Sequence, residues 1–212
     1  LWYNSYTLFN MFGGAIQIFS MMIFYPLLRK FTNNVKIFYI ALIGAIIGYA
    51  VLFGIAFINM SNVFILFVPG FFIFAANGVL QVLTTVFLAN TVDYGDLKNG
   101  RRDESVIFSM QTFVVKLASG IAAFIASLCL SINELSNDSD VSEADQVIDF
   151  AKNVSDSAKL GLRMTMTIIP IIGLIVAIFV FRKKFILNDE KMEEIAKELK
   201  ERKDLITNGV NL

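Results

Sequence analysis

The sequence predicts an all-α integral membrane protein, and two observations carry that prediction. Of its 212 residues, 56% are hydrophobic and 17% are charged, and the mean hydropathy is +0.66. A soluble domain has about 25% charged residues. The apolar residues also gather in several runs of about 20 residues or more, the length that an α-helix needs to cross a hydrocarbon core of about 30 Å.

The remaining composition argues against several classes of function. The formal net charge is zero, so the sequence does not indicate a nucleic-acid partner. The chain has no histidine and a single cysteine, Cys129. These counts leave no Cys/His cluster for zinc and no Ser-His-Asp or Cys-His set for catalysis. We therefore expect no metal site, no cofactor and no enzymatic activity.

Five spanning helices are expected, over residues 7–28, 37–60, 63–90, 105–132 and 161–182. Basic residues lie in the first and third connections and after the fifth helix, at positions 29–36, 98–102 and 182–184. The second connection has no charge, and the fourth is a long acidic segment over about 133–160. By the positive-inside rule, this pattern places the N-terminus of the chain outside and its C-terminus in the cytoplasm. Because five is an odd number for half of a transporter, we expect a fragment, with residues 1–6 as the end of another span.

The chain divides into a transmembrane bundle over residues 1–186 and a cytoplasmic tail over residues 187–212. In the tail, Asn188 is the expected N-cap of an amphipathic helix, with a narrow apolar stripe through Met192, Ile195, Ala196 and Leu199. We expect this helix to dock under the membrane domain. A second short helix is expected in the external acidic segment, within "SEADQVIDFAKNV".

A lysine in the middle of the fourth span is the most informative residue. Lys116 follows the cytoplasmic start of that span by about eleven residues, or roughly 16 Å at about 1.5 Å per residue. A lysine at that depth costs about 2.5–3.5 kcal/mol on insertion scales. Ser109, Thr112 and Ser119 share its helix face or lie next to it. We interpret Lys116 as facing a functional cavity, the alternative being a structural lysine paired with a buried carboxylate.

The third span carries a matching polar stripe, formed by Asn77, Gln81, Thr84 and Thr85 at helical spacing. Amides and hydroxyls both donate and accept hydrogen bonds, so they suit a ligand rich in hydroxyl groups. The same stripe would also serve to hold two helices together. In the second span, "GAIIG" at residues 44–48 permits close helix packing.

The connection "ANTVDYGDLKNGRRDES" places seven charged side chains of both signs between the third and fourth spans. A run of charges is by default a solvated surface. At a turn between two helices it also suggests a salt-bridge network that forms in one conformation and breaks in another. A carboxylate pair for hydrolysis is the competing interpretation, although no nucleophile or metal cluster accompanies it.

The stretch "NTVDYGDLKNGRRDESVIFSMQTFVVKLASGIAAFIASL" closely resembles a signature of the glycoside–pentoside–hexuronide:cation symporters, the melibiose-carrier-like branch of the major facilitator superfamily. The resemblance extends over nearly the whole chain and implies the C-terminal half of a twelve-helix carrier. It implies a central sugar site that opens alternately to each side, and symport with Na⁺, Li⁺ or H⁺. The partners so implied are a sugar or glycoside, the coupling cation, the lipid bilayer and a six-helix N-terminal bundle.

The resemblance also assigns roles to residues. It places Lys116 near the sugar and cation sites, and Gln111 and Thr112 on the cavity side of the same helix. It makes Asp93, Tyr94, Arg101, Arg102 and Glu104 parts of a cytoplasmic gating loop. Two positions depart from the family pattern: Asn90 replaces the first acid of the signature, and Gln81 stands where melibiose-type members carry a bulky aromatic. The cation-binding carboxylates of the family belong to the N-terminal half.

The sequence therefore predicts a secondary active transporter for a sugar or glycoside, in a bacterial inner membrane. Two alternatives remain open. One is a carrier on the same scaffold that transports a lipid or another amphiphile, which the 21 phenylalanines would suit. The other is a non-transporting membrane subunit, although an anchor has no need of a lysine at mid-depth.

Overall fold

The structure, a computed structural model, describes residues 2–57, 63–132 and 156–207, and these stretches are helical throughout apart from short connections. The long helices are α1 (Trp2–Phe19), α3 (Asn34–Ala56), α4 (Phe67–Asn99), α5 (Glu104–Ile132), α7 (Asp156–Lys184) and α8 (Asp189–Thr207). Short elements follow α1, namely η1 (Ser20–Phe24) and α2 (Tyr25–Phe31), and η2 (Val63–Leu66) precedes α4. The described residues contain no β-strand.

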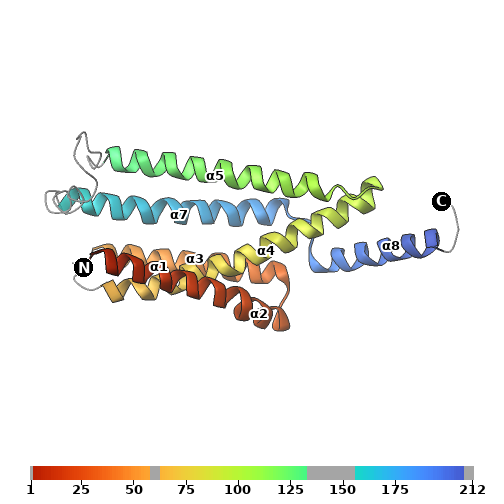
Figure 1. Cartoon of the computed structure of the whole chain (residues 1–212), viewed down its shortest axis with the longest axis horizontal. Coiled ribbons are helices and arrows are strands. Elements are labelled where there is room, and N and C mark those ends of the chain that lie inside the picture. The colour runs from red at the N-terminus through yellow and green to blue at the C-terminus, as the bar shows by residue number, and fades with distance from the viewer. Residues whose placement is uncertain (1, 58–62, 133–155, 208–212) are drawn as a thin grey trace.

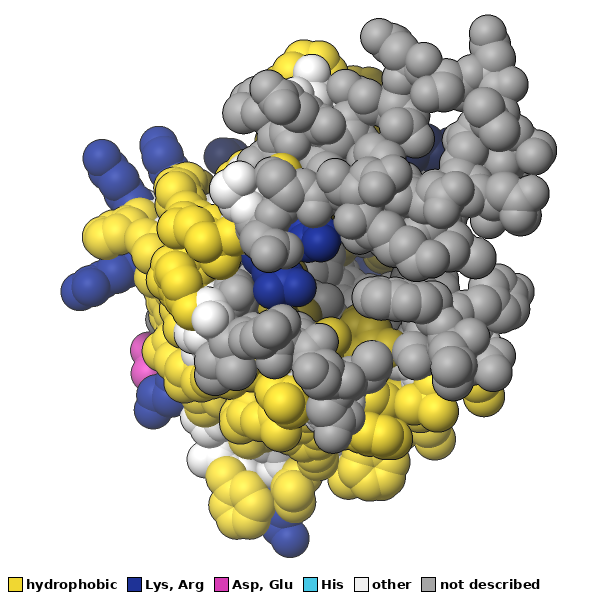
Figure 2. Space-filling view, turned by 90° about the vertical axis from the view of Figure 1, so that its left-hand side faces the viewer, with side chains coloured by type: hydrophobic (Ala, Val, Ile, Leu, Met, Phe, Trp, Pro, Cys, Tyr) yellow, Lys and Arg dark blue, Asp and Glu magenta, His cyan; other side chains and the backbone are white. Residues whose placement is uncertain are grey.

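Five stretches are long and apolar enough to cross a membrane: 7–31, 34–55, 64–99, 104–131 and 157–184. They confirm the predicted fold class, an all-α membrane bundle. Figure 1 shows that α1, α2 and α3 form one layer and that α5 and α7 form another. Helix α4 crosses between the layers and meets α5 at their connecting turn, and α8 extends beyond the end of α7. Hydrophobic side chains make up most of the described surface that is visible from the end nearest the N-terminus (Figure 2).

The first span is interrupted by a wide turn whose cause is a proline. Pro26 has no N–H group, and its ring would clash with the carbonyl of the residue four positions earlier. The preceding segment η1 is accordingly a π-helix, in which the N–H of Tyr25 bonds to the carbonyl of Ser20, five residues back. Inside this wide turn, the hydroxyl of the fully buried Ser20 donates to the carbonyl of Ala75 in α4 at 2.6 Å.

The core of the bundle lies between α3 and α4, where Ile37, Ala41, Val79 and Leu83 are buried together. The helices approach closely at Gly48, because a Cβ added there would lie 2.7 Å from Ile73 Cγ1. This position bears out the close packing predicted for "GAIIG". At Gly44 an added Cβ would meet nothing within 4 Å, so only one of the two glycines serves that packing.

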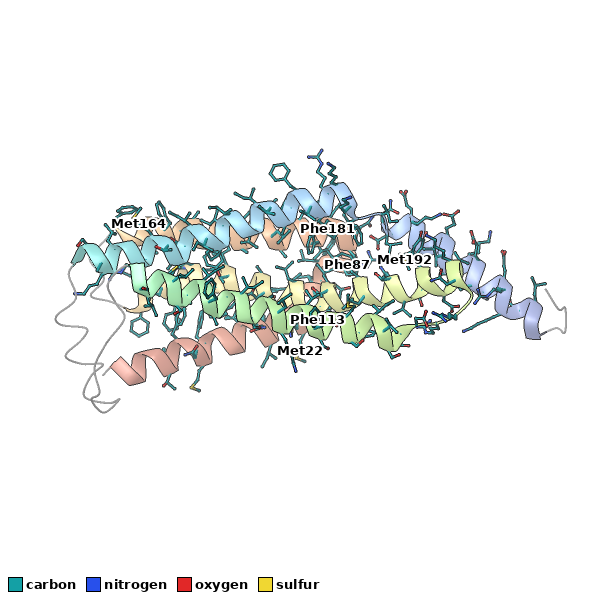
Figure 3. All side chains as sticks on the ribbon, turned by 90° about the horizontal axis from the view of Figure 1, so that it is seen from above. Met22, Phe87, Phe113, Met164, Phe181 and Met192 are labelled. Atoms are coloured by element: carbon teal, nitrogen blue, oxygen red, sulfur yellow. The ribbon has the colours of Figure 1, made fainter. Side chains whose placement is uncertain are left out.

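Helix α7 joins this core through aromatic rings. The rings of Phe87 in α4 and Phe181 in α7 lie side by side, with centroids 5.5 Å apart (Figure 3). Phe38 of α3 lies 4.1 Å from Phe181, and Phe185 stacks on Phe181 at 4.3 Å. Aromatic pairs in this range each contribute about 0.5–1.5 kcal/mol beyond the area they bury.

Three predicted boundaries are wrong. Helix α4 continues to Asn99 instead of ending near residue 90, and α7 begins at Asp156 instead of near 161. Residues 2–6 form the start of α1 and do not belong to a separate span. Helices α4 and α7 are longer than predicted because a helix that leaves the membrane still makes its own backbone hydrogen bonds in water. The short helix expected within residues 142–154 lies outside the described residues.

Candidate functional site

The polar stripe of α4 lies at the crossing of α4 and α1. Asn77, Gln81 and Thr84 are all exposed, and they follow one face of the helix. Gln17 of α1 donates its Nε2 to Gln81 Oε1 at 3.0 Å. The sequence interpretation missed Gln17, whose only signal is an amide within an apolar run. This bond leaves the NH₂ group of Gln81 and the side-chain carbonyl of Gln17 without a partner among the described residues. A ligand hydroxyl can accept from the first and donate to the second.

Small residues bring these two amides together. A Cβ added at Gly78 would lie 2.5 Å from the carbonyl oxygen of Gln17 and 2.9 Å from Ser20 Cβ. Only a glycine therefore allows the two backbones to approach this closely. Gln81 follows Gly78 by three residues, so it lies on the face next to the crossing. The crossing thus fixes where the two amides meet along α1 and α4.

The second predicted set of site residues lies on α5. Lys116 follows Glu104, the first residue of α5, by twelve positions, which is about 18 Å along the helix. Lys116 and Thr112 are exposed and Gln111 is half-buried. The Thr112 hydroxyl donates to the carbonyl of Phe108 at 3.0 Å, within its own helix. Lys116 has no hydrogen bond or ion pair with any residue that the structure describes, so a structural lysine held by a carboxylate finds no support there.

The two sets are not joined. Gln81 and Lys116 share no hydrogen bond within the described residues, and α4 and α5 meet at their connecting turn (Figure 1). Along α5, apolar side chains such as Phe113 and Leu117 are also exposed, at 59% and 52%. Helix α5 therefore presents both a polar and an apolar face that the described residues do not cover.

The charged connection is shorter than predicted, because Asp93 and Tyr94 are part of α4. Gly100 ends α4 in the left-handed conformation, with φ 73°, and its N–H bonds to the carbonyl of Asp96 at 3.0 Å. At about 1.5 Å per residue, the 33 residues of α4 extend about 50 Å, well beyond a hydrocarbon core of about 30 Å. Its charged last turns therefore project from the membrane.

Arg102 is the centre of the ion pairs at this turn. It donates to Asp93 at 2.8 Å and to Glu104 at 3.3 Å, and so connects the end of α4 with the start of α5. The hydrogen bonds to Asp93 and Glu104 raise the pKa of Arg102. Arg101 instead pairs with its neighbour Asp103 at 2.9 Å. The structure thus brings together Asp93, Arg102 and Glu104 of the predicted gating residues.

Helix α8 is held at both ends by ion pairs that the sequence interpretation missed. At one end, Asp189 accepts from Arg29 at 2.9 Å and from the backbone N–H of Asn34, the first residue of α3, at 3.1 Å. At the other end, Arg202 donates to Asp96 of α4 at 2.6 Å. The predicted N-cap is confirmed, since Asn188 Oδ1 accepts from the N–H of Lys191 at 2.9 Å. Partners more than 100 residues apart leave no local signal in a sequence.

Comparison with known proteins decides the family. Residues 2–189 match the sequence pattern of the family described as "MFS/sugar transport protein". The chain belongs to this family. The match confirms the predicted membership of the sugar-carrier branch of the major facilitator superfamily.

Individual relatives within the family of MFS sugar transport proteins are more distant. The chain is 24% identical, over 92% of its length, to a lactose permease of Lactobacillus delbrueckii subsp. bulgaricus. It is 26% identical, also over 92% of its length, to the raffinose carrier protein of Pediococcus pentosaceus. An isoprimeverose transporter of Lactiplantibacillus pentosus is 33% identical over 41% of the chain. The chain spans 29% and 28% of the length of the first two relatives.

Proposed function

We propose that this chain forms part of a secondary active transporter that moves a sugar or glycoside across the membrane by alternating access, together with a cation. The observation that carries this proposal is the pairing of Gln17 with Gln81 at mid-membrane, next to the exposed stripe of Asn77 and Thr84. Amides that keep a free donor and a free acceptor match the hydroxyls of a sugar. The names of the relatives, which include a lactose permease and a raffinose carrier, support this substrate class.

Lys116 supplies the charge of the proposed site. An intramembrane charge that is not paired has to face protein or water, because lipid would not solvate it. A second helical bundle, which completes the carrier, covers the polar face of α5 and closes the cavity around Lys116, Thr112 and Gln111. Sites at the middle of the membrane between two bundles are the general arrangement of such carriers. The coupling ion is Na⁺, Li⁺ or H⁺, and its ligands belong to that second bundle.

The proposed orientation follows from the loop charges. The connections at the α2–α3 end carry Arg29, Lys30 and Lys36, and the α4–α5 turn carries Arg101 and Arg102. Both ends are cytoplasmic by the positive-inside rule, which places the C-terminal helix α8 in the cytoplasm and the start of α1 outside. The membrane is a bacterial inner membrane.

The test of the proposed function is uptake by the full-length protein in membrane vesicles. The panel contains labelled glycosides, pentosides and hexuronides, each offered with and without an imposed gradient of Na⁺, Li⁺ or H⁺. We expect one class of sugar to accumulate only when one of the gradients is present. Absence of uptake of every sugar, in protein shown to be folded and inserted, would refute sugar transport and favour an amphiphilic cargo.

The Arg102–Asp93 pair is proposed to belong to the cytoplasmic gate. The Arg102 side chain is 52% exposed and that of Asp93 is 36% exposed, so the pair is accessible to a second bundle when the gate changes state. We expect Arg102→Gln to slow sugar exchange across vesicles, and the charge exchange Arg102→Asp with Asp93→Arg to restore part of the rate. Arg101→Gln removes a local pair of similar exposure and serves as the matched control. Equal slowing by Arg101→Gln and Arg102→Gln would contradict a gating role for Arg102.

A further inference from the structure

An apolar groove opens on the side of the bundle between η1–α2, α3 and α4. Its volume is about 240 Å³, and every residue that lines it is apolar. The lining residues include two from the first span, two from α3 and two from α4: Phe24, Leu27, Ile40, Gly44, Phe72 and Val79. The groove is separate from the polar stripe of Gln81 and Thr84, which does not line it.

Two local features account for the groove. The wide π turn over Ser20–Phe24 disturbs the regular spacing of the first span next to α3 and α4. On α3, Gly48 packs tightly on α4, whereas one turn away Gly44 faces open space, with nothing within 4 Å of an added Cβ. The helices are therefore in contact at Gly48 and separated at Gly44.

The chemistry of the groove argues against a sugar as its occupant. The groove offers no side-chain hydrogen bond, so the hydroxyls of a sugar would lose their water without replacement. Gly44 follows the start of α3 by ten residues, about 15 Å, so the groove lies at the depth of the acyl chains of one leaflet. A single acyl chain fits both its polarity and its location.

Two lysines stand at the membrane-surface end of this groove. Lys30 follows Leu27 by three residues, and Lys36 precedes Ile40 by four, so each lysine lies on the same helix face as a lining residue, one turn closer to the surface. Both lysines are exposed, and neither has an ion pair with a residue in the described part of the chain. The neighbouring Arg29 is different, because Asp189 already neutralises it.

We propose that this groove and its two lysines form a binding site for an anionic phospholipid. One acyl chain lies in the groove, and the phosphate of the headgroup lies between Lys30 and Lys36. The lipid comes from the leaflet at the α2–α3 end of the bundle, which the positive-inside rule makes the cytoplasmic leaflet. This leaflet is the one whose anionic lipids attract clusters of basic residues.

The experiment uses photolabelling of the full-length protein in vesicles. The probe is phosphatidylglycerol with a diazirine in the middle of one acyl chain, and phosphatidylcholine with the same chain is the neutral comparison. We expect both labels to reach the groove peptides of α3 and α4, with phosphatidylglycerol preferred about five- to twentyfold, because each lysine near the surface favours an anionic lipid by about fivefold. Equal labelling by the two lipids in the unmodified protein would overturn the proposal.

Two pairs of variants test the groove and its two lysines separately. Gly44→Leu fills the groove and should lower labelling of the groove peptides about tenfold with either lipid, whereas Gly54→Leu, at another open glycine of α3, should not. Lys30→Gln with Lys36→Gln should abolish the preference for phosphatidylglycerol. Lys183→Gln with Lys184→Gln, in the last turn of α7 and on the same side of the membrane, should keep it. Unchanged labelling in Gly44→Leu, or an unchanged preference in the Lys30 and Lys36 variant, would overturn the proposal. Should Gly44→Leu fail to fold, the lysine variants decide.

Discussion

Helices α4 and α5 have similar length and apolarity, yet they meet very different surroundings. In the most apolar stretch of α4, 33% of the residues are buried in this chain, compared with 6% in α5. Helix α4 packs on α1 and α3 through Gly78, Ala41 and the core leucine Leu83. In α5, Cys129 is the one buried hydrophobic residue among those described.

The difference shows which helices are stabilised by packing within the chain and which helix leaves a surface open to a partner. Apolar faces of α5 are stable against lipid tails, which are as apolar as leucine. Its polar face is not, because Lys116, Thr112 and Ser119 would lose their hydration there. A sequence of this kind is stable only if water or another protein surface covers that face. We infer that the packing of α4 on α1 and α3 stabilises the chain, whereas α5 offers an uncovered polar face to a partner.

The largest predicted effect is on stability and concerns the packing of α4 on α1. Gly78→Leu places a side chain against the backbone of α1, where an added Cβ already lies 2.5 Å from the carbonyl oxygen of Gln17. We expect it to lower the free energy of unfolding by about 3 kcal/mol. Thermal unfolding of the full-length protein in detergent, followed by circular dichroism, measures this loss.

The matched control is Gly120→Leu in α5, where an added Cβ meets nothing within 4 Å. We expect a change within about 0.5 kcal/mol, as at an open surface site. A loss equal to that of Gly78→Leu would show that the second bundle packs on α5 as tightly as α1 packs on α4. It would then contradict a water-filled cavity beside Lys116, which lies one turn away on the same face.

Much of this contrast could be predicted from the sequence. The five spans, the stripe on α4 and the depth of Lys116 depend on local spacing, which an α-helix translates directly into faces and depths. The partner of Gln81 could not be predicted, because Gln17 lies 64 residues earlier and one of many possible crossings brings them together. The same holds for Asp96 and Arg202, which are 106 residues apart. The predicted end of α4 differs from the structure for another reason: Asp93 and Asp96 mark the edge of the membrane, and the helix continues beyond that edge.

The second expected effect concerns transport and leaves stability unchanged. Lys116→Ala removes the charge of the proposed site, and a hydrogen bond to a charged group contributes about 1.5–3 kcal/mol. We expect gradient-driven sugar uptake to fall about 10- to 100-fold, with the thermal midpoint unaltered. Leu117→Ala, at the neighbouring exposed apolar position, is the control and should retain uptake. Normal accumulation in Lys116→Ala would show that this lysine is not part of the site.

The smallest effect tests whether α8 belongs to the stable layer. Asp96→Asn keeps the shape of the side chain but removes the charge that Arg202 meets at 2.6 Å. Their side chains are 16% and 31% exposed, so the pair is only partly screened by water, and we expect a loss of about 1 kcal/mol.

Because Asp189 still joins the other end of α8 to Arg29 and α3, the helix should loosen from its C-terminal end only. Hydrogen exchange should therefore rise over residues 196–205 and stay low near Asp189, whereas Asp204→Asn on the exposed face should change neither. A rise in hydrogen exchange along the whole of α8 would show that Asp96 holds the entire helix, and the contacts of Asp189 would then contribute little. An unchanged exchange pattern would assign the docking of α8 to its buried apolar contact, Ile195, which is 1% exposed.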